Sequence, residues 1–379
     1  MSPKSKKEYL ASIFLPYRNA SKKRKSQILN EFCLVCDYHR KYAIWLLKHH
    51  KRFTTPKPGK RGRASKYNNP AILEPLKQIW LAANLPCSSR LKAIIPLWLP
   101  FYPEALSAKV KEALLSISPS TIDRLLKSVR IKYGKRGRST TKPGTLLKKH
   151  IPIKTKQWDE TRPGFIEADT VAHCGGSLAG EFAYTVDTVD IATGWTEQRA
   201  VLGKGEAGVL EQLKDIEASY PFPLLGFDSD NGGEFINYHA LKHFTQREKP
   251  VAFTRSREYE SNDNAHIEQK NWTHVRQYFG YSRLDDPRVV SWMNEFYRLE
   301  SRLYLNFFLP SVKLLSKERI GSKTIKRHDL PKTPYQRVLE SKDVSTQTKN
   351  LLKEQFKTLN PFFLKKEMEK KLARIFNLH

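Results

Sequence analysis

A short apolar run that ends in carboxylates and glycines sets the strongest constraint on this sequence. Residues 223–227 are Pro-Leu-Leu-Gly-Phe, and residues 228–234 follow as Asp-Ser-Asp-Asn-Gly-Gly-Glu. The apolar run predicts a short buried strand, and the glycines predict a turn directly after it. A carboxylate at the point where a strand ends is held rigidly and stays reachable, which suits an oxygen ligand of Mg²⁺. One Asp-Asn-Gly stretch is also ordinary turn chemistry, so a metal site needs partner residues elsewhere in the chain.

The charge of the chain is unevenly distributed. The 379 residues carry a net charge of +29, yet residues 1–150 hold 33 Lys and Arg against 7 Asp and Glu, and residues 151–300 hold 16 against 24. Basic flanks of this density are typical of a protein that binds a polyanion, most simply double-stranded DNA. An acidic centre in such a protein is unfavourable unless cations neutralise it, which favours a carboxylate–metal site there.

Two classes of protein are disfavoured by the composition. The most apolar stretch, residues 93–101, contains Pro96 and Pro100 and is much shorter than the ~20 residues of a membrane span. The first ten residues are basic and polar, unlike a secretory signal. Four cysteines in this length argue against a disulfide framework and for a reducing compartment. We therefore expect a cytoplasmic protein without a membrane partner.

Two helical blocks precede the acidic centre. The first, residues 1–52, has two amphipathic helices joined by a short turn, which predicts either a DNA-binding helix-turn-helix or a plain helical hairpin. The second, residues 70–131, ends in a helix that the pattern from Ser120 to Asp123 predicts to begin with a capping box. The exposed side of that helix carries Arg124 and Lys127, which we expect to contact DNA.

Cys33 and Cys36 imitate the front half of a zinc finger, since His49 follows at a suitable distance. A second histidine three to five residues further on is missing from the sequence. The two cysteines are three apart on a predicted helix, which favours a place in the core over a zinc site.

A basic pentapeptide occurs twice, each time after a helical block. Gly-Lys-Arg-Gly-Arg stands at residues 59–63 and again at residues 134–138. Short Arg-Gly arms can lie in the minor groove of DNA, where the negative potential is concentrated. The alternative is a pair of solvated linkers. The candidate DNA contacts in these arms are Arg61, Arg63, Arg136 and Arg138.

Residues 158–300 change character and predict an α/β domain. The apolar periodicity predicts strands at 165–171, 181–191, 195–202, 223–227 and 251–254, and helices at 205–220, 237–246 and 266–281. This order predicts a mixed sheet with helices on its faces. Three basic residues lie in the last helix or in the loop before it. Arg255 and Arg257 fall in a loop before it and could contact phosphate, and Lys270 within it could contact DNA or be solvated.

Three carboxylates are placed where such a sheet would bring them together. Asp169 lies in the first strand, Asp230 directly follows the fourth, and Glu268 lies in the first turn of the last helix. Strands one and four are expected to be neighbours, so both aspartates would share one end of the site. Two Mg²⁺ ions about 3.5–4 Å apart can stabilise the attacking and leaving oxygens of a phosphodiester. Asp228 could take the place of Asp230, although its position inside the strand favours Asp230. Asp187 and Asp190 are interpreted as sheet-surface and turn residues.

Three sequence segments together resemble a known family. EADT at residues 167–170, FDSDNGGEF at 227–235 and NDNAHIEQKN at 262–271 resemble the integrase core of bacterial insertion-sequence transposases and retroviral-type integrases. The resemblance covers about residues 160–300. It implies a ribonuclease-H-like fold with an Asp-Asp-Glu metal triad, and it places the triad on Asp169, Asp230 and Glu268.

The resemblance, which extends to the upstream helical blocks, and the residue patterns of the other segments together predict an organisation of the whole chain. We expect an α/β, ribonuclease-H-like catalytic core flanked by all-α N-terminal domains and an α-helical C-terminal tail. The expected segments are a helix-turn-helix-like domain at 1–52, a basic linker at 53–69, a second such domain at 70–131, a basic linker at 132–157, the integrase core at 158–300 and a basic helical region at 301–379. Within the last region, residues 313–326 are expected to form a loop.

The resemblance also implies a function. The implied function is that of a Mg²⁺-dependent transposase. Such an enzyme can use Mn²⁺ in place of Mg²⁺ and needs no organic cofactor. Such an enzyme cuts at transposon ends and joins the freed 3′ hydroxyl to target DNA. Its partners would be terminal-repeat DNA, target DNA and further copies of the chain, at the bacterial nucleoid. Two alternatives remain, namely a catalytically silent DNA-binding protein derived from a transposase and a nuclease of the same fold without strand transfer.

Overall fold

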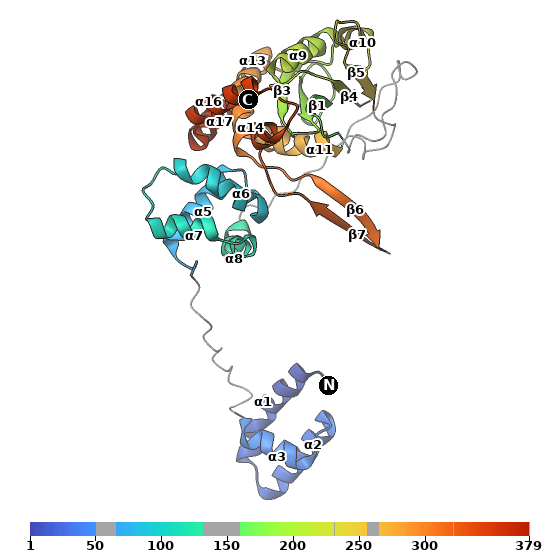
Figure 1. The fold of residues 1–379 in the computed structure, drawn as a ribbon. Coiled ribbons are helices and arrows are strands. Elements are labelled where there is room, and N and C mark those ends of the chain that lie inside the picture. The colour runs from blue at the N-terminus through green and yellow to red at the C-terminus, as the bar shows by residue number, and fades with distance from the viewer. Residues whose placement is uncertain (51–65, 132–159, 231, 256–264, 321, 379) are drawn as a thin grey trace. The chain divides into compact units, whose positions relative to one another are not determined.

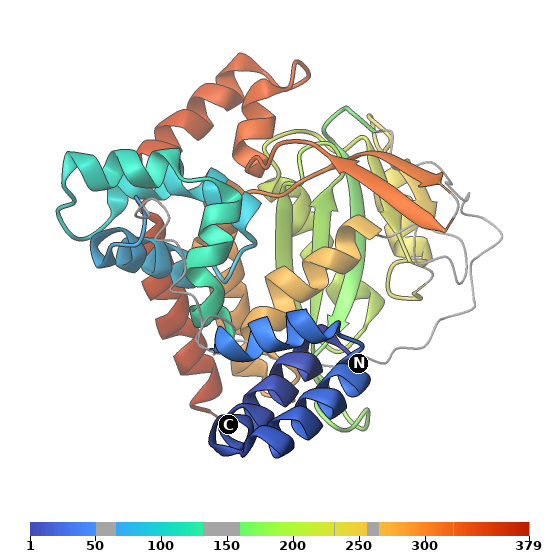
Figure 2. The same cartoon turned by 90° about the horizontal axis from the view of Figure 1, so that it is seen from below.

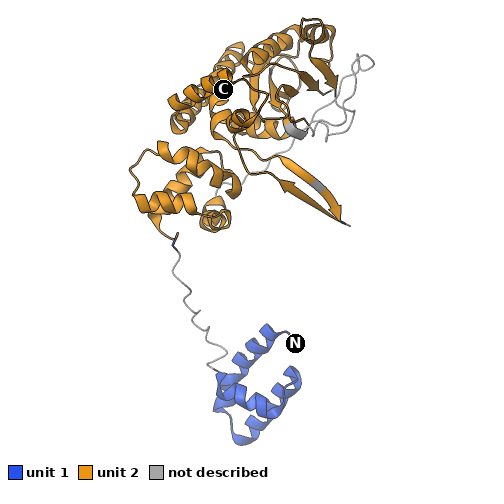
Figure 3. Ribbon diagram, in the orientation of Figure 1, with its two compact units in different colours: residues 1–66 blue, residues 67–379 orange. Residues whose placement is uncertain are grey.

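The computed structural model describes residues 1–50, 66–131, 160–230, 232–255, 265–320 and 322–378. The chain divides into two compact units, Met1–Lys66 and Tyr67–His379 (Figure 3). None of the helices in the described ranges is both long and apolar enough to cross a membrane. The finer domain boundaries expected from the sequence stay predictions.

The first unit is a bundle of three helices. These are α1 (Pro3–Asn19), α2 (Lys22–Cys36) and α3 (Arg40–Lys48). Ser21 caps α2 by accepting a hydrogen bond from the backbone N–H of Arg24 at 3.4 Å, as its position before the apolar pattern predicts. Cys36 is fully buried in the core of the bundle, so its place in the core is confirmed. The other members of this core are Leu10, Leu29, Phe32, Ala43, Leu46 and Leu47.

The second unit begins with a helical block. It consists of α5 (Pro70–Ala82), α6 (Ser88–Trp98), the short η1 (Leu99–Phe101), α7 (Ala108–Ser116) and α8 (Pro119–Arg130). The expected cap of the last helix is wrong by two residues. Ser118 caps α8 by accepting from the backbone N–H of Thr121 at 3.2 Å, because Pro119 is well suited to the first helical position. Asp123 instead accepts hydrogen bonds from Ser88 and Arg130.

This block is fastened to the C-terminal helices by long-range contacts. The indole N–H of Trp98 donates to the backbone carbonyl of Phe308 at 3.2 Å, and the hydroxyl of Tyr304 donates to the carbonyl of Ala82 at 2.5 Å. Asn84 bonds Tyr278 at 2.7 Å. The block and the C-terminal helices therefore share one hydrophobic core.

A five-stranded mixed sheet forms the centre of the second unit, as predicted. Its strands are β1 (Phe165–Ala172), β2 (Ala183–Asp190), β3 (Thr196–Leu202), β4 (Gly226–Ser229) and β5 (Ala252–Arg255), in the order β3-β2-β1-β4-β5 (Figure 1). The first three strands pair antiparallel, whereas β4 pairs parallel with both β1 and β5. The expected adjacency of strands one and four is confirmed.

Helices cover the sheet and close its β3 edge. They are α9 (Glu206–Ser219), α10 (Tyr238–Thr245), α11 (Ala265–Lys270) with its π-helical continuation η5 (Asn271–Arg276) and α12 (Gln277–Phe279), and α13 (Pro287–Phe296), η6 (Tyr297–Ser301) and α14 (Arg302–Phe308). The side chain of Asn294 exchanges two hydrogen bonds with the backbone of Ala200, and Asn306 does the same with Thr196, all at 2.7–2.9 Å. These amides satisfy backbone groups that an edge strand would otherwise expose.

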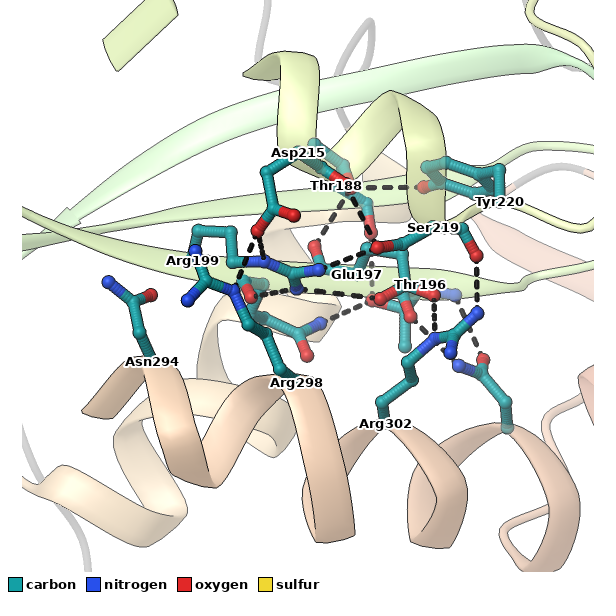
Figure 4. A network of polar contacts seen from close by, with 12 residues as sticks. Thr188, Thr196, Glu197, Arg199, Asp215, Ser219, Tyr220, Asn294, Arg298 and Arg302 are labelled. Carbon is teal, nitrogen blue, oxygen red and sulfur yellow. Dashed lines mark hydrogen bonds and ion pairs between the residues drawn. The ribbon is translucent and has the colours of Figure 1, made fainter. Parts of the chain in front are cut away.

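A buried ionic network fixes β3 between α9 and the helices that follow the core (Figure 4). Arg199 is 1% exposed and contacts Asp215 of α9 and Glu197 of its own strand. Glu197 also pairs with Arg302 of α14 at 2.6 Å. Each buried charge therefore has an opposite charge beside it, which such burial requires.

The C-terminal region is not wholly helical, contrary to expectation. Residues predicted as a basic loop form an antiparallel hairpin of β6 (Leu314–Ile320) and β7 (Lys323–His328), which extends away from the sheet (Figure 1). Charged residues occupy both faces of these strands, so the apolar alternation that marks a half-buried strand is missing. Three helices end the chain, namely α15 (Pro334–Glu340), α16 (Thr346–Thr358) and α17 (Pro361–Phe376).

Candidate active site

Two carboxylates of the predicted triad meet at the end of neighbouring strands. Ala168 of β1 and Ser229 of β4 are the last pair in the parallel register. Asp169 directly follows Ala168 in β1, and Asp230 directly follows Ser229 at the end of β4. Both aspartates therefore lie at the same end of the sheet. Burial, and after it the charge of Asp230, raises the pKa of the Asp169 carboxyl to about 7. Burial likewise raises the pKa of Asp230. The repulsion between them is what a bound cation would relieve.

Hydrogen bonds orient each of these two carboxylates. Asp169 accepts from the side-chain amide of Asn271 at 2.6 Å and from the backbone N–H of Thr170 at 2.7 Å. Asp230 accepts from the backbone N–H of Gly232 at 3.0 Å. A methyl group at Gly232 would lie 2.9 Å from an Asp230 oxygen and 2.7 Å from a Glu234 oxygen, so any larger residue there requires these two carboxylates to shift.

The helix that carries Glu268 is anchored over β1. The gold segment 265–279 crosses the sheet in Figure 2. The backbone N–H of Ile267 donates to the Glu167 carboxylate at 3.1 Å, and Asn271 contacts Asp169 as described above. The backbone of Glu268 lies between these two anchoring residues, while its side chain is outside the described part of the chain.

A further carboxylate, Asp187, lies beside Asp169. It was expected on the sheet surface, but it is fully buried in β2 and pairs with Asp169 in the register. Its Oδ1 accepts from Gln198 at 2.8 Å, and its Oδ2 has no hydrogen-bond partner among the described residues. Burial raises its pKa to about 7. The strand alternation alone left open which face of β2 would be covered.

The neighbouring aspartates have structural partners. Asp190 holds the turn after β2, as expected, by accepting from the backbone N–H of Gly164 at 2.8 Å and from Thr193 at 2.6 Å. Asp228 is buried within β4 and accepts a hydrogen bond from Thr254 of β5. This contact occupies Asp228 with strand pairing and favours Asp230 as the ligand.

An ion pair at the same end of the sheet was also missed. Glu234 is 6% exposed and accepts from Lys204 at 2.6 Å and from the hydroxyl of Thr170 at 2.8 Å. The charges of Glu234 and Lys204 both act on Asp230. Glu234 stands four residues after Asp230, but only the fold brings Lys204, which follows β3, to the same point.

The residues predicted to contact DNA fall into three groups. Arg124 and Lys127 are exposed on α8, as expected. Arg255 is not in a polar loop, since it is the last residue of β5 and only 7% exposed. Lys270 is half-buried. Burial lowers its pKa to about 8, although the negative charge of Asp187 acts in the other direction and raises it. The remaining candidates lie outside the described residues, namely Arg61, Arg63, Arg136, Arg138 and Arg257.

The donor set suits a hard cation. Carboxylate oxygens are the ligands that Mg²⁺ and Mn²⁺ prefer, and Asp169 and Asp230 supply them at a fixed place. Within the described side chains, no three His, Cys, Asp or Glu residues are arranged to hold a metal ion. Glu268, the third expected ligand, is not among those side chains.

A curated protein resembles this chain over most of its length. No protein-family model matches the sequence. The uncharacterized protein y4rM of Sinorhizobium fredii is 36% identical over 344 residues, which cover 89% of this chain and 96% of the relative.

Solved structures of lower similarity include two of viral origin. A chain of the simian T-cell lymphotropic virus intasome, in complex with PP2A regulatory subunit B56 gamma, is 14% identical and has a TM-score of 0.32 over 59% of this chain and 69% of that one. The catalytic core domain of BIV integrase is 15% identical and has a TM-score of 0.28 over 47% of this chain and 94% of that one.

Proposed function

The chain belongs to the same family as the Sinorhizobium fredii protein, whose name assigns no activity, and we propose that it is a metal-dependent DNA transposase. It would cut DNA at the ends of its element and join the 3′ hydroxyl to target DNA. The observation that carries the proposal is the meeting of Asp169 and Asp230 at the end of two parallel strands, beneath the helix that bears Glu268. The strand order, three antiparallel and two parallel, supports a ribonuclease-H-like core.

The chain's own residues prepare the site. Asn271 and the backbone of Thr170 hold Asp169 in one orientation, and the turn at Gly232 holds Asp230. Mg²⁺, held by these aspartates and Glu268, would stabilise the attacking and leaving oxygens of the phosphodiester. The carboxylates have to be ionised to hold the ion, so their raised pKa values couple metal binding to pH.

The charge of the chain supports DNA as the substrate. Residues 1–150 are strongly basic, and Arg124 and Lys127 lie exposed on α8. We infer that these regions bind the terminal repeats, that an oligomer holds two ends together, and that Mn²⁺ can replace Mg²⁺. Nothing in this chemistry needs an organic cofactor or a covalent protein intermediate.

One assay separates the three candidate activities. The protein is incubated with labelled duplexes from the DNA on either side of its gene, with target plasmid and Mg²⁺. Joined product supports transposition, nicking without joining supports the nuclease, and retarded but uncut DNA supports the silent binding protein.

Two matched substitutions test the ligand assignment. Asp230→Asn removes the proposed ligand and is expected to reduce cleavage by about 10³-fold or more. Asp228→Asn keeps an acceptor for Thr254 and is expected to stay active. The assignment of Asp230 fails if the two results are exchanged.

A further inference from the structure

The β6–β7 hairpin has two chemically different faces. Residues paired across an antiparallel ribbon share a face, and successive residues alternate between faces. Arg319 pairs with Thr324, Lys317 with Lys326, and Leu314 with His328. The described side chains of this set, namely Arg319, Thr324, Lys326, Leu314 and His328, form what we call the basic face. The opposite face contains Ile320 paired with Lys323, Glu318 with Ile325, and Ser316 with Arg327.

The basic face is cationic and accessible. Arg319, Lys326 and His328 are exposed, and the described side chains of this face include no carboxylate. The opposite face holds Glu318 and two exposed isoleucines, Ile320 at 57% and Ile325 at 44%. Glu318 opposes the charges of Lys323 and Arg327 on that face, whereas no described carboxylate on the basic face opposes Arg319 and Lys326.

A cavity at the base of the hairpin continues this positive surface. It has a volume of about 320 Å³ and is lined by Lys326 and His328 from the hairpin together with Arg90 of α6, Lys270 of α11 and Lys313. Asp190 is the one carboxylate among the described residues that line it, and it is already bonded to Gly164 and Thr193. The lining thus carries an excess of positive charge.

Lys313 is half-buried in the lining of this cavity. Burial lowers the pKa of Lys313 to about 8, and its ammonium group donates to the backbone carbonyl of Ala192. A second cavity of about 250 Å³ also has Arg90 and Lys270 in its lining, so these two cations lie between the two cavities.

We propose that the basic face and this cavity together form a groove for the sugar–phosphate backbone of a DNA duplex, separate from the carboxylate site. The groove is charge-complementary to phosphate, and the major groove of B-DNA admits a two-stranded ribbon. Lys326 and His328 stand two residues apart on β7, about 7 Å, so their side chains can meet successive phosphates along one strand. The choice of DNA rests on the proposed function, but binding in the groove requires no metal.

The test compares two double charge reversals in the full-length protein. Arg319→Glu with Lys326→Glu changes the basic face, and Lys323→Glu with Arg327→Glu makes the same change in net charge on the opposite face. Binding of a fluorescent duplex is measured by anisotropy in EDTA over a range of salt concentrations. All four residues are on the exposed ribbon, and circular dichroism checks that both variants fold.

The basic-face variant is expected to bind about tenfold or more weakly, and its salt dependence should fall by about two units of slope, since two phosphate contacts are lost. The control variant should bind within about twofold of the unchanged protein. Equal loss in both variants, or no loss in the first, overturns the proposal. A loss seen with single-stranded RNA but not with duplex DNA overturns it as well.

The binding experiment on the hairpin variants and the cleavage assay can fail independently of each other. If the unchanged protein never cleaves DNA but the basic-face variant loses binding, the groove stands and the transposase assignment fails. If cleavage depends on Asp230 but both hairpin variants bind normally, the groove is wrong and the transposase assignment stands.

Discussion

Asp169 of β1 and Asp187 of β2 are directly paired in the antiparallel register, so two carboxyl groups lie side by side on one face of the sheet. Burial is the largest cause that raises the pKa of each to about 7. Asp230 adds a third acidic group at the same end of β1. Without a cation, this end of the sheet therefore accumulates unfavourable charge as the pH rises.

Asp169→Asn is expected to stabilise the metal-free protein at high pH. The folded state holds the Asp169 proton more tightly than the unfolded chain does, so the stability that this carboxyl contributes is lost as pH rises from about 4 through about 7. The neutral amide escapes that loss. In urea unfolding with EDTA, the advantage of Asp169→Asn should grow over this window and reach about 1 kcal/mol or more above it.

The control for this experiment is Asp285→Asn, which changes an exposed carboxylate paired with Arg283. Its unfolding in the same series shows what the loss of an exposed carboxylate does by itself. A variant at Asp169 that is less stable than the unchanged protein at pH 8 would contradict the burial argument.

Gly232→Ala is expected to lower cleavage, whereas Gly233→Ala is expected to leave it nearly unchanged. A methyl group at Gly232 would collide with the carboxylates of Asp230 and Glu234, and one at Gly233 would meet nothing within 4 Å. Displacing a catalytic group by a fraction of an ångström can reduce a rate by about 10–10²-fold. Single-turnover cleavage rates of the two variants measure the difference. Equal rates would contradict a role for Gly232 in placing the Asp230 carboxylate.

Asn271→Ala is expected to weaken metal binding through Asp169. The amide donates to a carboxylate oxygen of Asp169, and loss of such an orienting bond typically costs about 10–100-fold in metal affinity. The Mn²⁺ concentration needed for half-maximal cleavage measures the effect, and high Mn²⁺ should restore much of the rate. Thr273→Ala, which loses only a bond to the Gln269 carbonyl, is the matched control. An Mn²⁺ requirement equal in both variants would exclude a positioning role for Asn271.

Arg199→Met is expected to destabilise the protein strongly. Arg199 lies between Glu197 and Asp215 with 1% of its surface exposed, and its removal leaves the fully buried Glu197 with less compensation. Breaking a buried pair in this way costs roughly 3–5 kcal/mol. Arg288→Met, at a solvent-exposed pair with Asp286, should cause no resolvable change. Chemical unfolding of both variants gives the comparison, and similar midpoints would show that the network in Figure 4 contributes little.

The sequence was sufficient for the parts of the fold that apolar periodicity controls. The apolar run before Asp228 and the glycine turn after Asp230 predicted β4. The order of elements predicted that β4 lies beside β1. Neither the burial of Asp187 nor the approach of Lys204 could be predicted, because both depend on which residues from distant segments cover them. The β6–β7 hairpin was missed because exposed, charged strands have no apolar face to mark them.

The N-terminal cap of α8 was also predicted wrongly, because the prediction used the local sequence alone. Ser118 and Ser120 are both suitable capping residues, and Ser120 has the acidic residue three positions later that a capping box requires. The structure uses Asp123 for contacts with Ser88 and Arg130 instead. A tertiary contact thus outweighed a local pattern that was valid by itself.

The contacts of Asn84 with Tyr278, of Ala82 with Tyr304 and of Trp98 with Phe308 join residues 67–131 to much later segments independently of peptide connectivity. Two polypeptides, one ending at residue 131 and the other starting at residue 160, should consequently assemble by complementation when produced together. The core of the second unit then depends on the synthesis of both the helical block and the C-terminal helices. Nascent chains therefore cannot complete it until α14 and α17 have left the ribosome.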